Sequence, residues 1–329
     1  MWKFLVRRIL LGLLIIVMGA MVVYTVIRCL PASYVEKMAR QLAAGSLGRI
    51  NFEEALAQLE HSYGLDSGII KGYFIWLWNA LGGNFGNSWA YAIPVTQKFA
   101  EVIWWSVLMN IITYVFQMVT CIPLGILAAR KQYSKTDYAV TVFALACISL
   151  PTFYLATLLR YVFAVKLGIF PFVGIYGNTF LYMNTFEKIV DVAYHLVLPV
   201  ITLAMLSVGG LMRYTRTNML EVLNADYIRT ARAKGLPEKK VINKHAFRNT
   251  LIPLISYMSY LLPGMFGGAM ITETIFGIPG IGKIAYDAMI VGDIPFSMFY
   301  SVFMMVLTQV SLIIADILYA VADPRVRVN

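Results

Sequence analysis

Residues 215–249 read TRTNMLEVLNADYIRTARAKGLPEKKVINKHAFRN, a basic, helix-forming segment that lies between strongly apolar stretches. Charged side chains are expensive in hydrocarbon, so this segment predicts a substantial loop at one membrane face. Thr217–Lys234 consists of good helix formers without Gly or Pro, which predicts one helix. Gly235 then offers a left-handed stop, and Pro237 suits the first turn of a second helix. The segment therefore predicts a helical elbow that projects from a membrane domain and is suited to being held by another protein.

The composition is that of an integral membrane protein. Of the 329 residues, 60% are hydrophobic and only 13% are charged, whereas soluble domains carry about 25% charged residues. The three cysteines fall in or beside apolar stretches, and the three histidines are isolated from one another. We therefore expect no disulfide framework, no metal site, no catalytic cluster and no cofactor bound by this chain itself.

Six segments are long and apolar enough to span a bilayer, for which about 20 residues are needed. They are Ile9–Ile27, Val102–Ala128, Tyr138–Val165, Leu196–Met212, Leu251–Ile271 and Met298–Ala322. The basic N-terminus and its apolar run also fit a signal peptide, but the first small-residue cleavage candidate, Leu42–Ala44, lies well beyond the run. The first segment is therefore interpreted as a retained helix.

The positions of Lys and Arg in the short loops predict the orientation of the chain. Both termini, the Arg130–Lys135 loop and the basic elbow share one side, whereas the opposite short loops mix basic with acidic residues. Both termini and the elbow are therefore expected in the cytoplasm, and the net charge of +10 reflects topology rather than nucleic-acid binding. The predicted organisation is residues 1–30 (tip and first helix), 31–98 (extracytoplasmic segment), 99–322 (membrane core with the loop 213–250) and 323–329 (cytoplasmic tail).

The stretch Gly277-Ile-Pro-Gly-Ile-Gly282-Lys283 matches the first seven positions of a phosphate-binding loop. The eighth position is Ile284, where a Ser or Thr would bind magnesium. No soluble strand precedes the stretch, and the predicted topology puts it outside, away from ATP. We interpret it as a tight glycine-rich turn and expect no ATP hydrolysis by this chain.

A family resemblance rests on Asp226-Tyr-Ile-Arg-Thr-Ala-Arg-Ala-Lys-Gly235-Leu followed by His245-Ala-Phe-Arg-Asn249-Thr-Leu-Ile-Pro253. Further pieces in the expected order are the basic N-terminal helix, Tyr63-Gly-Leu-Asp66, Gly83-Asn-Phe-Gly-Asn-Ser88, Glu273-Thr-Ile-Phe-Gly-Ile-Pro-Gly-Ile-Gly282 and Asp323-Pro-Arg325. The chain resembles peptide-type ABC importer permeases over nearly its whole length, and most of all the B subunits of oligopeptide and dipeptide permeases. The resemblance implies an all-α type I importer fold with six transmembrane helices and a cytoplasmic coupling helix.

The same resemblance implies where partner proteins bind. The residues expected to dock a cytoplasmic ATPase are Asp226, Tyr227, Ile228, Arg229, Thr230, Ala231, Arg232, Ala233, Lys234 and Gly235. The general importer signature begins Glu-Ala-Ala, where this chain has Arg229-Thr230-Ala231, and Asn84 stands where the family usually has Asp. The implied partners are a homologous permease, two ATPases that bind ATP and magnesium, and an extracytoplasmic binding protein that delivers peptides. The implied location is a bacterial or archaeal cytoplasmic membrane.

Polar residues inside the predicted spans are candidates for the translocation path, because they are costly in lipid unless they face a partner or water. They are Asn110, Gln117, Arg160, Glu273, Gln309 and Asp316.

Other functions remain open at this point. A secondary transporter or channel would act without ATPases, although neither inverted repeats nor a midplane ion site is evident. An importer for a nickel chelate uses the same permease family, whereas a membrane enzyme would need a nucleophile–base or metal constellation that the sequence does not display.

Overall fold

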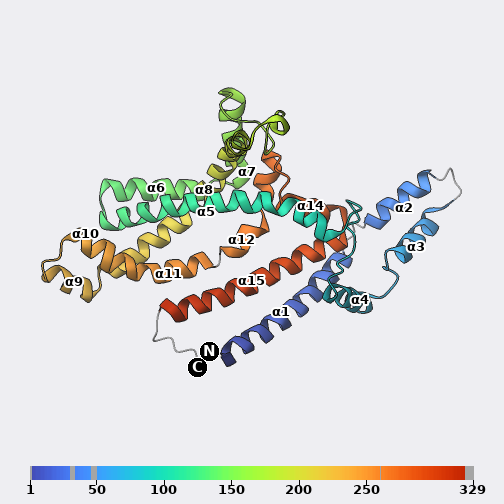
Figure 1. The fold of residues 1–329 in the computed structure, drawn as a ribbon, viewed down its shortest axis with the longest axis horizontal. Coiled ribbons are helices and arrows are strands. Elements are labelled where there is room, and N and C mark those ends of the chain that lie inside the picture. The colour runs from blue at the N-terminus through green and yellow to red at the C-terminus, as the bar shows by residue number, and fades with distance from the viewer. Residues whose placement is uncertain (1, 30–33, 46–49, 260, 323–329) are drawn as a thin grey trace. The chain divides into compact units, whose positions relative to one another are not determined.

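The computed structural model describes residues 2–29, 34–45, 50–259 and 261–322, so the predicted tail and its Asp323-Pro-Arg325 motif lie outside the described residues. The described chain is helical apart from turns, loops and one isolated bridge between Asn87 and Pro94 (Figure 1). It divides into two compact units, residues 1–104 with 281–309 and residues 105–280 with 310–329. Each unit is described by itself.

The first unit is built on the N-terminal helix. It contains α1 (Trp2–Arg28), α2 (Tyr34–Gly45), α3 (Phe52–Ser62), α4 (Ile69–Leu81), α14 (Ile281–Val291), the start of α5 (Val95–Arg130) and most of α15 (Ile294–Ala322). α4 packs on α1, where the buried Tyr73 hydroxyl donates to the carbonyl oxygen of Val17 at 2.6 Å. The long segment after α1 is therefore fastened to it by a buried polar contact.

The second unit is organised around α8 (Thr185–Leu223). The other elements are the rest of α5, α6 (Lys135–Ser149), α7 (Thr152–Leu159), the π-helix η1 (Arg160–Lys166), the 3₁₀ turn η2 (Phe180–Tyr182), α9 (Asp226–Ala233), α10 (Glu238–Lys240), the π-helix η3 (Val241–Ala246), α11 (Phe247–Ser259), α12 (Leu262–Gly267), α13 (Met270–Phe276) and the end of α15. Helices α6, α7, α11 and α13 all contact α8. α6 approaches closely at Gly209, where an added Cβ would lie 2.8 Å from the carbonyl oxygen of Ala144.

Four helices are each long and apolar enough to cross a membrane, namely Val6–Arg28, Val95–Arg130, Thr185–Leu223 and Ile294–Ile317. They correspond to the predicted first, second, fourth and sixth spans. Two further candidates pass only as bent pairs, so the described residues contain four spans, or up to six if each bent pair is one span.

The third predicted span, Tyr138–Val165, is not one straight helix. Helices α6 and α7 meet at an angle of 101°. Pro151 lacks an N–H, and it disfavours helical backbone at Leu150, which is extended with ψ near 127°. The range predicted as the fifth span, Leu251–Ile271, is divided among α11, α12 and α13, and the second bent pair is Pro263–Phe276 with Ile281–Val291.

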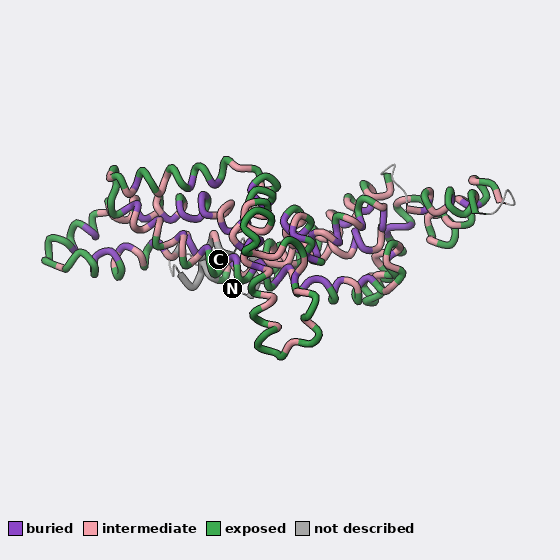
Figure 2. The backbone as a smooth tube through the Cα atoms, turned by 90° about the horizontal axis from the view of Figure 1, so that it is seen from above, coloured by how far each residue is buried: buried purple, intermediate pink, exposed green. Residues whose placement is uncertain are grey.

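Many residues along the helices are exposed (Figure 2), and large apolar side chains are among them. Leu10 on α1, Val119 on α5 and Val142 on α6 are each more than 60% exposed. Apolar side chains on the outside of long helices are tolerated in lipid, since hydrocarbon does not penalise them as water does. The exposure therefore agrees with an integral membrane protein.

Candidate functional site

The basic elbow begins where α8 ends. Asn224 and Ala225 interrupt the helix predicted over Thr217–Lys234, and Ala225 is extended with φ −71° and ψ 148°. Asp226–Ala233 then form the separate helix α9. The prediction of one continuous helix is therefore wrong at these two residues, because the chain must turn for α9 to pack back on the membrane helices.

The corner after α9 follows the predicted chemistry. Gly235 is left-handed with φ +76°, and its N–H donates to the carbonyl oxygen of Arg232 at 2.9 Å. Pro237 lies immediately before α10, with φ −61° and ψ 139°. The stop predicted at Gly235 is therefore present, and the chain leaves it into a short helix and then η3.

One face of α9 is anchored in an apolar cluster. Ile228 is fully buried and Ala231 is 6% exposed. They pack with Met219 near the end of α8, Ala129 near the end of α5 and Val241 at the start of η3. Since these elements belong to one cluster, α9 is fixed to the ends of two long helices and is not a free surface loop.

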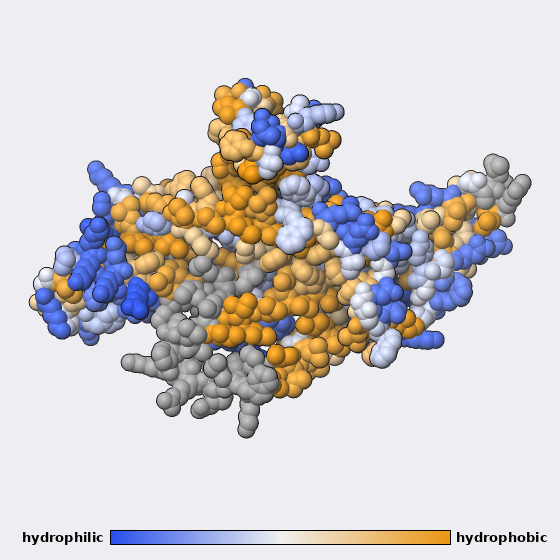
Figure 3. Space-filling model, in the orientation of Figure 1, coloured by the Kyte–Doolittle hydropathy of each residue, from blue (hydrophilic) through white to orange (hydrophobic). Residues whose placement is uncertain are grey.

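The other face of α9 is polar and exposed, and Figure 3 shows hydrophilic side chains over α9 and α10. Tyr227 is 49% exposed, and the Arg229 side chain pairs loosely with Asp226 at 3.5 Å. The remaining predicted docking residues on this face are also exposed: Thr230, Arg232, Ala233, Lys234 and Gly235. The structure thus divides the predicted docking set into two buried anchors and an exposed surface.

An ion pair spans the corner. The Arg232 guanidinium donates to both carboxylate oxygens of Glu238, at 2.9 and 3.2 Å. This hydrogen bonding lowers the pKa of Glu238, and the charge of Arg130 adds a smaller effect in the same direction. Arg232 is therefore partly engaged within the elbow, a role that its sequence position did not predict.

Three of the predicted path residues lie around α12 and α13. The amide of Asn110 donates to the carbonyl oxygen of Met265 at 3.1 Å. The buried carboxylate of Glu273 accepts from the Ser106 hydroxyl at 2.6 Å and from the Ala269 N–H at 3.0 Å.

Arg160 donates to the carbonyl oxygen of Ile275 and stacks over Phe172 at 4.5 Å. Glu273 and Arg160 thus bind backbone groups at the start and the end of α13, whereas Asn110 binds the backbone of α12.

The other three path candidates are placed separately. Gln117 is 3% exposed on α5, and Asp316 is half-buried on α15. Gln309 lies opposite Gly12 of α1, where an added Cβ would be 3.2 Å from the Gln309 side-chain oxygen.

The glycine-rich turn resembling a phosphate loop is closely packed. Gly277 is left-handed with φ +66°. A Cβ added at Gly280 would collide with the Glu273 carboxylate and would lie 2.6 Å from the Ser106 hydroxyl. Lys283 forms an ion pair with Asp287 at 2.6 Å. Among the described residues, no group of three or more His, Cys, Asp or Glu side chains could hold a metal ion.

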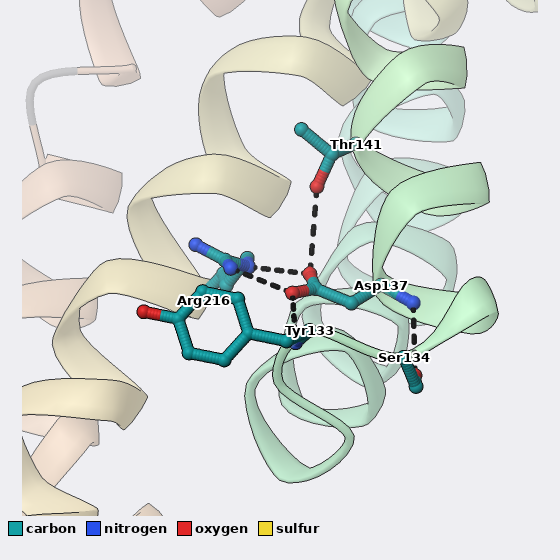
Figure 4. Close-up of polar contacts among 5 residues, drawn as sticks. All are labelled: Tyr133, Ser134, Asp137, Thr141 and Arg216. Carbon is teal, nitrogen blue, oxygen red and sulfur yellow. Dashed lines mark hydrogen bonds and ion pairs between the residues drawn. The ribbon is translucent and has the colours of Figure 1, made fainter.

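A buried ion pair near the elbow escaped the sequence reasoning. The Asp137 carboxylate on α6 accepts two hydrogen bonds from the Arg216 guanidinium on α8. It also accepts one from the Tyr133 N–H and one from the Thr141 hydroxyl (Figure 4). Ser134 caps α6 by accepting from the Asp137 N–H. The Ser134-x-x-Asp137 spacing is a helix-start signal and could have directed attention to this acid.

Comparison with known proteins defines the class. Residues 121–328 match the family model described as binding-protein-dependent transport system inner membrane component. The match covers more than half of the chain, including α8, the elbow and the turn after α13. The chain therefore belongs to this family of multi-pass membrane permease subunits.

Particular relatives extend the match toward the N-terminus. The chain is 39% identical to the oligopeptide transport system permease protein AppB of Bacillus subtilis (strain 168), over 82% of this chain and 84% of the relative. It is 34% identical to the oligopeptide transport system permease protein OppB of Haemophilus influenzae, over 83% of this chain and 86% of the relative. The dipeptide transport system permease protein DppB of Alkalihalophilus pseudofirmus is 31% identical over 99% of this chain and 100% of its own.

Proposed function

We propose that this chain is the transmembrane permease subunit of an ATP-driven, binding-protein-dependent importer of peptides. The observation that carries the proposal is the elbow, in which Ile228 and Ala231 anchor α9 to the membrane helices while Tyr227 and Arg229 face outward. Family membership supports the transport role, and the names of the relatives support peptides as the cargo.

In this proposal both termini and the elbow are cytoplasmic, and each bent helix pair forms one of six spans. A cytoplasmic ATPase grips the exposed face of α9. A homologous second permease completes the translocation pathway, and its own elbow takes the second ATPase. ATP and magnesium bind only to the ATPases, and an extracytoplasmic binding protein delivers the peptide.

The packing of the elbow supports a rigid transmission of force. A protein interior responds to displacement as a packed body and not as a fluid. Because α9 shares its apolar cluster with α5, α8 and η3, a displacement of α9 carries the ends of these helices with it. Closure of the ATPases on ATP thereby reorients the transmembrane helices and changes which side of the membrane the pathway faces.

Within the membrane, the six polar candidates divide into two roles in this proposal. Asn110, Arg160 and Glu273 hold the broken segment α12–α13 in shape, because their polar atoms are engaged with its backbone. Gln117, Gln309 and Asp316 remain the candidates for direct contact with the peptide.

Reconstitution tests the proposal. The chain is co-expressed with its partner permease and the two ATPases, and the complex is placed in proteoliposomes with the binding protein and a radiolabelled peptide. ATP-dependent peptide uptake with all partners present supports the proposal. Uptake by this chain alone, driven by a proton gradient, would indicate a secondary transporter. ATP-dependent uptake of a nickel chelate without peptide uptake would show that the substrate is a chelate and not a peptide.

A further inference from the structure

The ion pair between Asp137 on α6 and Arg216 on α8, called the joint below, connects the two helices in a defined geometry. The guanidinium Nε lies 2.7 Å from Oδ1 of Asp137, and Nη2 lies 2.8 Å from Oδ2. The Asp137 side chain is only 6% exposed and that of Arg216 is 24% exposed. A paired guanidinium and carboxylate with two parallel bonds resist both sliding and rotation, which a single contact does not.

The same carboxylate also holds the turn between α5 and α6. The Tyr133 N–H donates to Oδ2 at 3.0 Å, and Tyr133 adopts a left-handed backbone with φ +62°. This conformation is unfavourable for a tyrosine and persists only where the surroundings enforce it. Asp137 thus ties together the end of α5, the start of α6 and the flank of α8.

The joint lies close to the elbow along α8. Arg216 precedes the end of α8 at Leu223 by about two helical turns. Between them, Met219 belongs to the cluster that anchors Ile228 of α9. Displacement of α9 therefore reaches Arg216 through one continuous helix and one packed cluster.

Beyond the joint, α6 meets α8 mainly through apolar packing. Ala144 of α6 and Val208 of α8 share a buried cluster, and Ile148 lies against Gly209. This packing resists sliding through the shapes of the side chains, whereas the paired hydrogen bonds also fix the orientation of the two charged groups. The ion pair therefore adds a directional constraint to the one that packing supplies.

The C-terminal end of α6 leads toward α13. After the bend at Pro151, α7 packs on α13, and Arg160 then donates to the carbonyl oxygen of Ile275. A displacement of α6 is thus carried to α13 through helix packing and a charged hydrogen bond.

We propose that the Asp137–Arg216 pair is a positioning element that makes α6 move with the coupling elbow, so that ATPase closure is passed to α7 and α13 as well as along α8. This proposal rests on the proposed function, because it assigns a role within the same ATP-driven cycle. It predicts that the pair governs how many ATP molecules are hydrolysed for each peptide transported. Neither residue contacts nucleotide or peptide in this mechanism.

The test uses the complete complex in proteoliposomes, after the wild-type complex has been shown to hydrolyse ATP and to import peptide. A wild-type complex that fails in both activities overturns the proposed function and is separable from the outcomes below. The variants are Asp137→Asn, Arg216→Gln and the double variant. Asp287→Asn, which removes the half-buried ion pair with Lys283, is the matched control.

We expect each single variant to assemble with the ATPases and to hydrolyse about threefold or more ATP per peptide imported, the scale typical of energetic coupling through packed networks. The double variant should hydrolyse as much ATP per peptide as either single variant, because the first substitution has already removed the ion pair. Asp287→Asn should keep the wild-type ratio.

An unchanged ratio in the assembled variants overturns the proposal, as does a proportional fall of both rates. Where Asp137→Asn prevents assembly, Arg216→Lys provides the same measurement, since lysine keeps the charge and loses the paired geometry. A wild-type ratio in that variant would also overturn it.

Discussion

Gly235→Val tests the corner of the elbow with little steric interference. Gly235 has φ +76°, and a Cβ built there meets no heavy atom within 4 Å. The substitution therefore introduces no clash and acts through the backbone alone. A left-handed conformation costs a non-glycine residue about 1–2 kcal/mol, and valine is among the less tolerant residues because of its branched Cβ.

This cost sets the expected magnitude. If α9 docks an ATPase only with the native corner, the added 1–2 kcal/mol lowers the population of that corner, and hence the apparent affinity, by about fivefold to thirtyfold. Insertion into the membrane and pairing with the second permease should be unaffected, since the corner is exposed and contributes no buried side chain.

Gly168→Val is the matched control. Gly168 is also left-handed, with φ +61°, and an added Cβ there also meets nothing within 4 Å. The two variants therefore carry similar backbone strain at positions far apart in the chain. Binding of the purified ATPase to permease heterodimers in nanodiscs measures the difference.

We expect Gly235→Val to weaken ATPase binding and Gly168→Val to leave it unchanged. Equal affinity for both variants and the wild type would refute the assignment of α9 and its corner as the docking site. Equal losses in both would show that strain anywhere in the chain is sufficient, which would also contradict the reasoning.

Three further outcomes are expected. Gly209→Leu should lower the thermal midpoint of the purified protein, at a cost of about 2 kcal/mol or more, because even a Cβ at this position would lie 2.8 Å from a backbone carbonyl of α6; an unchanged midpoint would contradict the close approach. Single cysteines at Glu60 and Lys239 in a cysteine-free background should label from opposite sides with an impermeant thiol reagent, and labelling of both from outside would refute the orientation. The pKa of Glu238, followed by carboxyl chemical shift, should lie below that of an ordinary glutamate and rise in Arg232→Gln; because the folded pKa is lowered, the ion pair stabilises the elbow at neutral pH and its contribution is lost as the pH falls through that pKa. An unaltered titration in Arg232→Gln would exclude the ion pair in solution.

Several features of the protein follow from local sequence. Four long spans can be recognised in the sequence because a helix that crosses a bilayer needs about 20 mostly apolar residues in succession. The left-handed stop at Gly235 is likewise local, since only glycine enters that backbone region without cost. The family resemblance also rested on contiguous motifs, which need no knowledge of the fold.

Tertiary packing decided where α8 ends and α9 begins. Helix propensity favours continuing α8 past Asn224, but the preference of a single residue is worth less than about 1 kcal/mol. Turning the chain at Ala225 buries Ile228 completely, which stabilises by about 1.5–3 kcal/mol for a large aliphatic side chain. The burial of Ile228 outweighs the helix propensity, and α9 becomes a helix separate from α8.

Pairings between distant residues were also beyond the reach of sequence. Asp137 and Arg216 are separated by 79 positions, and Arg160 and Ile275 by 115. Polarity alone marked Arg160 and Glu273 as candidates for contact with substrate, because an intramembrane charge must be satisfied by something. Only the fold decided that backbone groups of α13 and a neighbouring hydroxyl satisfy them, since the partner of a polar group depends on which elements pack together and not on its neighbours in the chain.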